Sequence, residues 1–182
     1  MGSAAPAVWP RRRGWLSRPG FTLIELLIAM TVMVLLVSRG APIFSAWVQN
    51  TQIRTAAEAL QNGLQIARQQ AVQLNTQVQM VLTGSDWTVS VVNPTSAIQS
   101  RTNSGDTPNA SVASTQTTVV FNGLGRVTPS QAGVIVFGVS NPTAGGCVAV
   151  GGPMRCLNVT VQSGGQIRMC DPKLPVADPQ SC

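Results

Sequence analysis

The sequence predicts an α+β fold in which one long N-terminal helix packs on a mostly antiparallel β-sheet. Three patterns support this prediction. Residues 20–38 form an apolar run, residues 53–74 carry an apolar stripe at helical spacing, and short period-two segments separated by glycines follow residue 76. A chain of 182 residues suits one membrane helix and one domain of ordinary size.

The apolar run contains a single charged group, Glu25, close to its start. An acid at the centre of a membrane helix costs roughly 2.5–3.5 kcal/mol, and such residues are by default functional. Four arginines precede the run, at positions 11, 12, 13 and 18, and Arg39 follows it. Cytoplasmic positive charge of this kind orients a membrane helix with its N-terminus inside the cell.

Three interpretations of this segment compete. A secretory signal has a shorter apolar core and a small-residue cleavage site, and here Pro42 would directly follow a cut after Ala41. A plain signal anchor leaves Glu25 without a role. In the third interpretation the chain is cut after Gly20, so the helix is retained and Glu25 pairs with a terminal amine, either its own or a neighbour's. The residues favour this third interpretation.

The helix is expected to continue to about residue 75 as an amphipathic segment. Its apolar stripe has alternating spacings of four and three and consists of Ile53, Ala57, Leu60, Leu64, Ala67, Ala71 and Leu74. We expect this stripe to pack on the chain's own sheet, with a coiled-coil seam as the alternative. Gly40 and Pro42 are expected to bend or loosen the helix, because proline lacks a backbone donor.

Strands are expected where β-branched residues alternate with polar ones. The predicted ranges are 76–82, 87–92, 117–121, 134–139, 148–150, 157–161 and 166–169. Trp87 is expected to be a packing residue. Residues 93–116 are rich in Ser, Thr, Asn and Pro and predict a long mobile loop. The proline-containing tail, residues 171–182, is expected to be irregular.

The four cysteines all lie in the last fifth of the chain, at positions 147, 156, 170 and 182. A hairpin about Gly151 and Gly152 would put Cys147 opposite Cys156 at a non-hydrogen-bonded position. This favours Cys147–Cys156 with Cys170–Cys182, while Cys156–Cys170 with Cys147–Cys182 stays open. Zinc binding is a weaker alternative, since the sequence has no histidine and no CxxC pair.

The residue inventory argues against an enzyme and requires no cofactor or metal. Without histidine, Ser–His and Cys–His nucleophile pairs are excluded. The acids of the soluble part are scattered without a paired arrangement, at positions 58, 86, 106, 171 and 178. Gly123-x-Gly125 predicts a turn, because a phosphate-binding motif would need a further glycine and a helix.

The net charge is +6, from 12 cations and 6 acids. Loss of the four leader arginines would leave eight cations against the same six acids, a net charge of +2. The overall charge is therefore weak support for nucleic-acid binding.

Residues 20–26, G-F-T-L-I-E-L, resemble the processing site of type IV prepilins and type II secretion pseudopilins. The resemblance implies that prepilin peptidase cuts after Gly20 and methylates Phe21, and that Glu25 helps dock each subunit in a filament. The leader, at 20 residues with Pro19 before Gly20, departs from the family by its length. The implied fold is pilin-like.

The order of elements after the helix resembles the GspH and FimT/FimU subgroup. The cues are residues 121–126, F-N-G-L-G-R, and a strand at 157–161 followed by a glycine turn, Ile167 and Arg168. The implied function is that of a FimT-like minor pilin of a type IV pilus. A GspH-like pseudopilin of type II secretion and an unrelated membrane-anchored periplasmic binding domain are the alternatives.

Some FimT-type minor pilins bind DNA through a Gly-Arg-x-Arg motif. Here Gly165 is followed by Gln166, Ile167 and Arg168, so the first arginine is replaced. The candidate DNA-binding residues are Arg126, Arg155, Gln166, Arg168 and Lys173. The alternative is that these arginines solvate a sheet face or cap carbonyls.

The resemblance also implies partners, a location and a domain plan. The expected partners are prepilin peptidase, other pilins or pseudopilins, the inner membrane and double-stranded DNA. The expected segments are a leader (1–20), a transmembrane and filament-core helix (21–40), a periplasmic amphipathic helix (41–75), a sheet domain (76–170) and a disulfide-closed tail (171–182).

Overall fold

The computed structural model describes residues 20–129 and 133–182. The chain divides into two compact units, Met1–Gly40 and Ala41–Cys182. One helix, α1 (Leu23–Leu74), supplies residues to both units, and it continues without a break through Gly40 and Pro42. Each unit is described by itself below.

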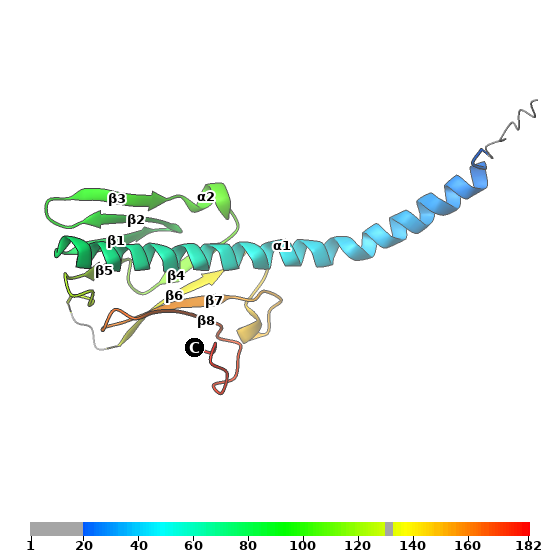
Figure 1. Cartoon of the computed structure of the whole chain (residues 1–182). Coiled ribbons are helices and arrows are strands. Elements are labelled where there is room, and N and C mark those ends of the chain that lie inside the picture. Colours follow the sequence, from blue (N-terminus) through cyan, green and yellow to red (C-terminus); the bar gives the residue numbers. More distant parts are fainter. Residues whose placement is uncertain (1–19, 130–132) are drawn as a thin grey trace, which may run out of the picture. The chain divides into compact units, whose positions relative to one another are not determined.

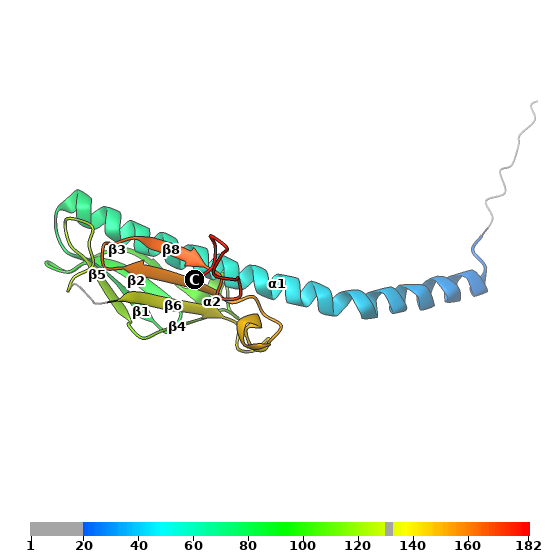
Figure 2. The same ribbon diagram turned by 90° about the horizontal axis from the view of Figure 1, so that it is seen from below.

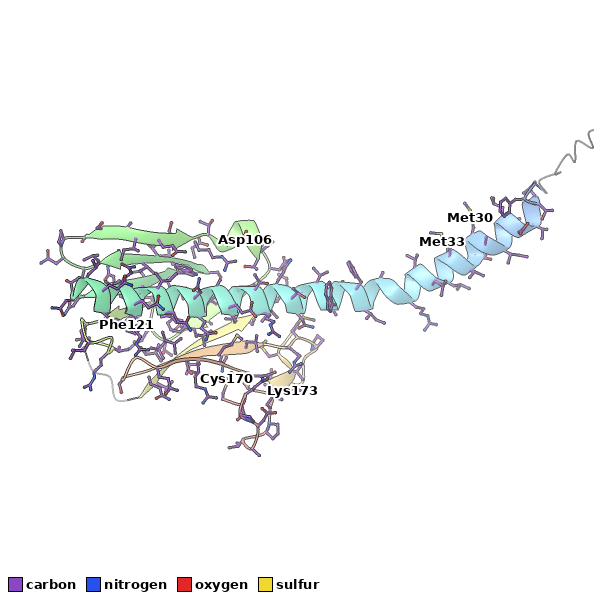
Figure 3. All side chains as sticks on the ribbon, viewed as in Figure 1. Met30, Met33, Asp106, Phe121, Cys170 and Lys173 are labelled. Atoms are coloured by element: carbon purple, nitrogen blue, oxygen red, sulfur yellow. A yellow bond between two sulfur atoms is a disulfide. The ribbon has the colours of Figure 1, made fainter. Side chains whose placement is uncertain are left out.

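The described part of the first unit is the beginning of α1. It contains an 18-residue window with a mean hydropathy of 2.0, of which none is buried. In Figure 3 the labelled Met30 and Met33 project from the helix, and they are 61% and 66% exposed. By length and apolar composition this helix can cross a membrane.

In the second unit, α1 buries the predicted apolar stripe. Six of its seven residues are at most 1% exposed, namely Ile53, Ala57, Leu60, Leu64, Ala67 and Ala71. Leu74 is 51% exposed, because the helix ends at this residue. Asn75 has a φ of 47°, and the amides of Asn75 and Thr76 donate to the carbonyls of Val72 and Ala71. This pattern is a Schellman motif, which turns the chain into the first strand.

The domain half of α1 lies along two four-stranded antiparallel sheets (Figures 1 and 2). The first sheet has the order β3-β2-β1-β5, and its strands are β3 (Ser96–Arg101), β2 (Asp86–Val91), β1 (Val78–Thr83) and β5 (Thr118–Phe121). The second has the order β4-β6-β7-β8, and its strands are β4 (Ser111–Ser114), β6 (Val134–Ser140), β7 (Leu157–Gln162) and β8 (Ile167–Cys170).

One hydrophobic core joins α1 to both sheets. Phe121 of β5 and Phe137 of β6 are fully buried in it, and Figure 3 labels Phe121 beside α1. Trp87 is 4% exposed and packs on Gly63 of α1, where an added Cβ would lie 3.0 Å from the indole ring. Gly63 therefore permits the close approach of the first sheet to the helix, and Trp87 is a packing residue as expected.

Six of the predicted strands are present, with ends shifted by no more than two residues. The predicted α+β fold, a long helix on antiparallel strands, is confirmed, and the strands form two sheets where one was expected. The prediction of a long loop at residues 93–116 is wrong. This segment forms β3, α2 (Asn103–Asp106) and β4. Because β3 and β4 are edge strands with mostly exposed or half-buried side chains, their polar residues stay in contact with water while their backbones pair.

The predicted strand at 148–150 is a 3-10 helix, η1 (Val148–Val150). Gly151 ends it with a φ of 86°, and Cys147 pairs with Met154 in a parallel bridge, so the expected antiparallel hairpin register is absent. The disulfides nevertheless join Cys147 to Cys156 and Cys170 to Cys182, with Cα separations of 5.4 and 5.0 Å. A compact turn about Gly151 brings the first pair together without a hairpin.

Candidate functional site

The N-terminal motif, residues 20–26, leads into the first turn of α1, which begins at Leu23. The amide of Glu25 donates to Oγ1 of Thr22 at 3.3 Å, and the amide of Leu26 donates to the Thr22 carbonyl at 3.1 Å. Thr22 is therefore the N-cap of α1, a role that sequence reasoning missed. The signal was present, because Thr22-x-x-Glu25 has the spacing of a capping box.

Glu25 lies in the first helical turn, where the helix dipole favours a negative charge. Its side chain is exposed, and among residues 20–129 and 133–182 it forms no ion pair. Glu25 can therefore stabilise the N-terminus of its own helix, and its carboxylate is also accessible to a cation of a partner.

The helix after Glu25 presents apolar side chains on all sides. Between Leu26 and Val37 the exposed large residues are Leu26, Leu27, Ile28, Met30, Val32, Met33, Val34, Leu35, Leu36 and Val37. A helix that is hydrophobic all round is buried in lipid or among other helices. The chain itself supplies no cover for these residues in the part that the structure describes.

Two of the five candidate DNA-binding residues lie beside the C-terminal part of α1. Arg126 follows a loop in which Arg68 of α1 donates from Nε to the Gly125 carbonyl at 3.2 Å. Gln166 follows Gly165, which has a φ of 83° and is packed against Gly125. The side chains of Arg126 and Gln166 are both exposed.

Two other candidates lie near the beginning of the domain helix. The amide of Arg155 donates to Oδ1 of Asn50 at 2.9 Å, and its guanidinium forms an ion pair with Asp171 at 2.8 Å. Asp171 also accepts the amide of Lys173, whose side chain is exposed in the tail (Figure 3). Asn50 and Arg68 are 18 residues apart, or about 27 Å along α1 at 1.5 Å per residue.

The fifth candidate, Arg168 on β8, donates from Nη2 to the carbonyl of Pro179 at 2.8 Å. This is the carbonyl-capping contact that the sequence left open as the alternative to DNA contact. The structure therefore does not gather the five residues into one cluster. Arg155 and Arg168 already hold the tail, whereas Arg126 and Lys173 have no ion-pair partner among the described residues.

A hollow of about 530 Å³ lies between α1 and the end of the second sheet. Its lining includes Trp47, Arg54, Arg155 and Met169. No group of three or more cysteines or acids in residues 20–129 and 133–182 is placed to hold a metal.

Comparisons with known proteins agree with this architecture. A model of the prokaryotic N-terminal methylation motif matches residues 16–38. The crystal structure of the type IV minor pilin FimU of Pseudomonas aeruginosa PAO1 in space group P21 is similar, with 19% identity, a TM-score of 0.53 and coverage of 75% of this chain and 98% of that chain. The P65 crystal form of FimU gives 17% identity, a TM-score of 0.49 and coverage of 71% and 98%.

The sequence has no significant match among proteins of curated function. The FimU likeness, at this identity, establishes the pilin fold alone. The family comes from a second model, described as type II transport protein GspH, which matches residues 56–170 and thus more than half of the chain. The chain therefore belongs to the GspH family, whose members are structural pilin-like subunits, and it carries the N-terminal methylation motif of such subunits.

Proposed function

We propose that this chain is a minor pilin of a type IV pilus, of the FimT kind, made as a precursor. Prepilin peptidase removes residues 1–20 by cutting after Gly20, and Phe21 becomes the methylated N-terminus. Residues 21–40 then cross the bacterial inner membrane with the N-terminus in the cytoplasm, while the helix (41–75), the sheet domain (76–170) and the closed tail (171–182) lie in the periplasm. The proposal depends mainly on one observation: a methylation motif stands at the start of a helix whose apolar side chains are not covered by any of the residues that the structure describes.

In the filament, Glu25 pairs with the terminal amine of a neighbouring subunit while the apolar helices of the subunits bundle. A carboxylate moved from lipid into such a bundle stays dehydrated, so a cationic partner stabilises it. The neutral amide of a glutamine side chain can replace only part of this interaction with the amine. Glu25→Gln should therefore lower incorporation into pili but leave membrane insertion intact. Immunoblots of sheared pili and of membrane fractions measure the two quantities.

Thr22→Ala is the matched control for the local role of Glu25. It removes the hydroxyl that caps the Glu25 amide, at a cost of about 0.5–2 kcal/mol, and leaves the carboxylate in place. If Glu25 acts by pairing across subunits, Thr22→Ala incorporates nearly normally. Equal defects in both variants, or normal incorporation of Glu25→Gln, would contradict the pairing role.

The second candidate is a pseudopilin of a type II secretion system, which the description of the matching family model favours. Both machines use the same motif at residues 20–25, so the site does not separate them. Deleting the gene in the source bacterium separates them. Loss of surface pili with normal protein secretion supports the pilus, and loss of secretion with normal pili supports the pseudopilus.

DNA binding is the further part of the proposal. Exposed cations contact phosphates without reading sequence, and such binding weakens as salt rises. Arg126 and Lys173 are available for this role, while Arg155 and Arg168 would have to share their guanidinium groups with contacts inside the domain. Binding per subunit should therefore be weak.

A gel shift at low salt with residues 41–182 tests this, because that unit contains the whole buried core. Arg126→Ala and Arg168→Ala should each weaken binding. Arg101→Ala is the control, because Arg101 lies on the edge strand β3 of the first sheet and already pairs with Asp106 of α2. Equal shifts for all four proteins would exclude Arg126 and Arg168 from DNA contact.

A further inference from the structure

The beginning of the domain helix carries a surface that no other part of residues 20–129 and 133–182 covers. Ile43, Phe44 and Trp47 are 74%, 66% and 64% exposed, and the rings of Phe44 and Trp47 have centroids 6.1 Å apart. Spacings of three and four residues put them on one face of α1. We call these three residues the 43–47 patch. The opposite face is engaged, since Ala46 packs on the core and the Gln49 side chain accepts a hydrogen bond from buried Asn141.

Along the helix, the nearest charged residues on either side of the 43–47 patch are cations. Between Glu25 and Glu58 the sequence contains Arg39 and Arg54 and no acid. Beside Trp47, Arg54, Arg155 and Asp171 line the hollow between α1 and the second sheet. Arg54 is paired with Glu58 and Arg155 with Asp171, and the two arginine side chains keep 69% and 58% of their surface exposed. Aromatic rings flanked by long cationic side chains are the composition found at membrane–water interfaces, where the rings lie at headgroup level and the cations reach phosphates.

The distance along the chain matches this layer. A hydrocarbon core of about 30 Å takes about 20 helical residues, which is the span 21–40. The headgroup regions add about 5–8 Å on each side, or roughly three to five residues, so residues 41–45 fall within this region. At the average tilt of membrane helices, about 20°, the hydrocarbon core takes about 21 residues, and Trp47 then lies about 8 Å beyond the core, at the outer edge of the headgroup region.

We infer that the 43–47 patch docks in the phospholipid headgroup layer of the membrane that the preceding helix spans, and so sets the depth of the anchored subunit. The inference rests on the anchorage part of the proposed function and does not depend on processing, on filament assembly or on DNA. Its partner is a lipid surface; a second copy of the chain is the competing occupant.

Tryptophan fluorescence in vesicles can test this docking on the full chain. The four tryptophans are at positions 9, 15, 47 and 87. Replacing Trp9 and Trp15 with phenylalanine leaves Trp47, which is exposed, and Trp87, which is 4% exposed in the core. This protein is reconstituted in phosphatidylcholine–phosphatidylglycerol vesicles whose lipids are brominated either near the headgroup end or near the methyl end of the acyl chain.

The inference predicts three results together. The protein floats with the vesicles, its emission falls more with bromine near the headgroup end than with bromine near the methyl end, and adding Trp47→Phe abolishes the loss. Flotation without quenching of Trp47 would overturn the docking while leaving the anchorage intact. Failure to float would overturn the anchorage and the docking together. Protection of Trp47 from aqueous quencher that grows with protein density, without quenching by bromine, would assign the patch to a second copy.

Discussion

Replacing Arg155 with alanine should destabilise the domain and loosen its C-terminal tail. The guanidinium lies 2.8 Å from the Asp171 carboxylate, and the two side chains are 58% and 6% exposed. Exposed ion pairs contribute about 0–1 kcal/mol, whereas breaking a buried one costs about 3–5 kcal/mol. Because one partner is buried and the other is solvated, we expect a loss of about 2 kcal/mol.

For a domain of this size such a loss lowers Tm by about 4–8 °C, measurable by thermal denaturation of residues 41–182 with intact disulfides. Asp171→Asn is the matched partner variant, since its side-chain oxygen can still accept the Lys173 amide. The double variant should lose less than the sum of the two single losses. An unchanged Tm for Arg155→Ala, or strictly additive losses, would refute a stabilising pair.

The same two variants separate structure from DNA contact. Asp171→Asn frees the Arg155 guanidinium and removes a negative charge. If Arg155 contacts phosphate, Arg155→Ala should weaken DNA binding and Asp171→Asn should strengthen it. If Arg155 serves only to hold the tail, Arg155→Ala and Asp171→Asn should give the same DNA gel shift.

Three further predictions concern the core, a turn and the tail. Leu64→Ala should cost about 3 kcal/mol in urea unfolding, because Leu64 is fully buried; a loss below about 1 kcal/mol would mean that the site collapses freely. Gly165→Ala should cost about 1–3 kcal/mol, because its φ is 83° and an added Cβ meets a facing carbonyl. Gly164→Ala, with open space around it, should be nearly neutral, and equal losses would contradict this account. Cys182→Ser should make the tail sensitive to protease while the rest of the domain stays resistant, and uniform sensitivity would contradict a local role.

The sequence alone determined the features whose causes are local. The stripe from Ile53 to Ala71 has the helical period, so its buried face follows from spacing alone. The strands predicted at 76–82 and 87–92 are likewise local, and they form the hairpin of β1 and β2 about Gly84, which has a φ of 63°. The N-terminal motif is also local, since its seven residues are consecutive in the chain.

Only the tertiary structure shows the features that depend on contacts between residues far apart in the sequence. The edge strands β3 and β4 are too polar to be recognised alone, because backbone pairing with β2 and β6 stabilises them rather than burial of their side chains. The division into two sheets follows from pairing between strands that are not consecutive in the chain, such as β1 with β5.

The candidate cations show the same limit most clearly. The sequence alone does not distinguish Arg126, Arg155 and Arg168 as candidates for DNA contact. In the fold, the Arg155 amide meets Asn50, 105 residues earlier, and its guanidinium meets Asp171, while Arg168 caps Pro179. A side chain's availability depends on which distant groups the fold brings within hydrogen-bond reach, and no local pattern carries that information.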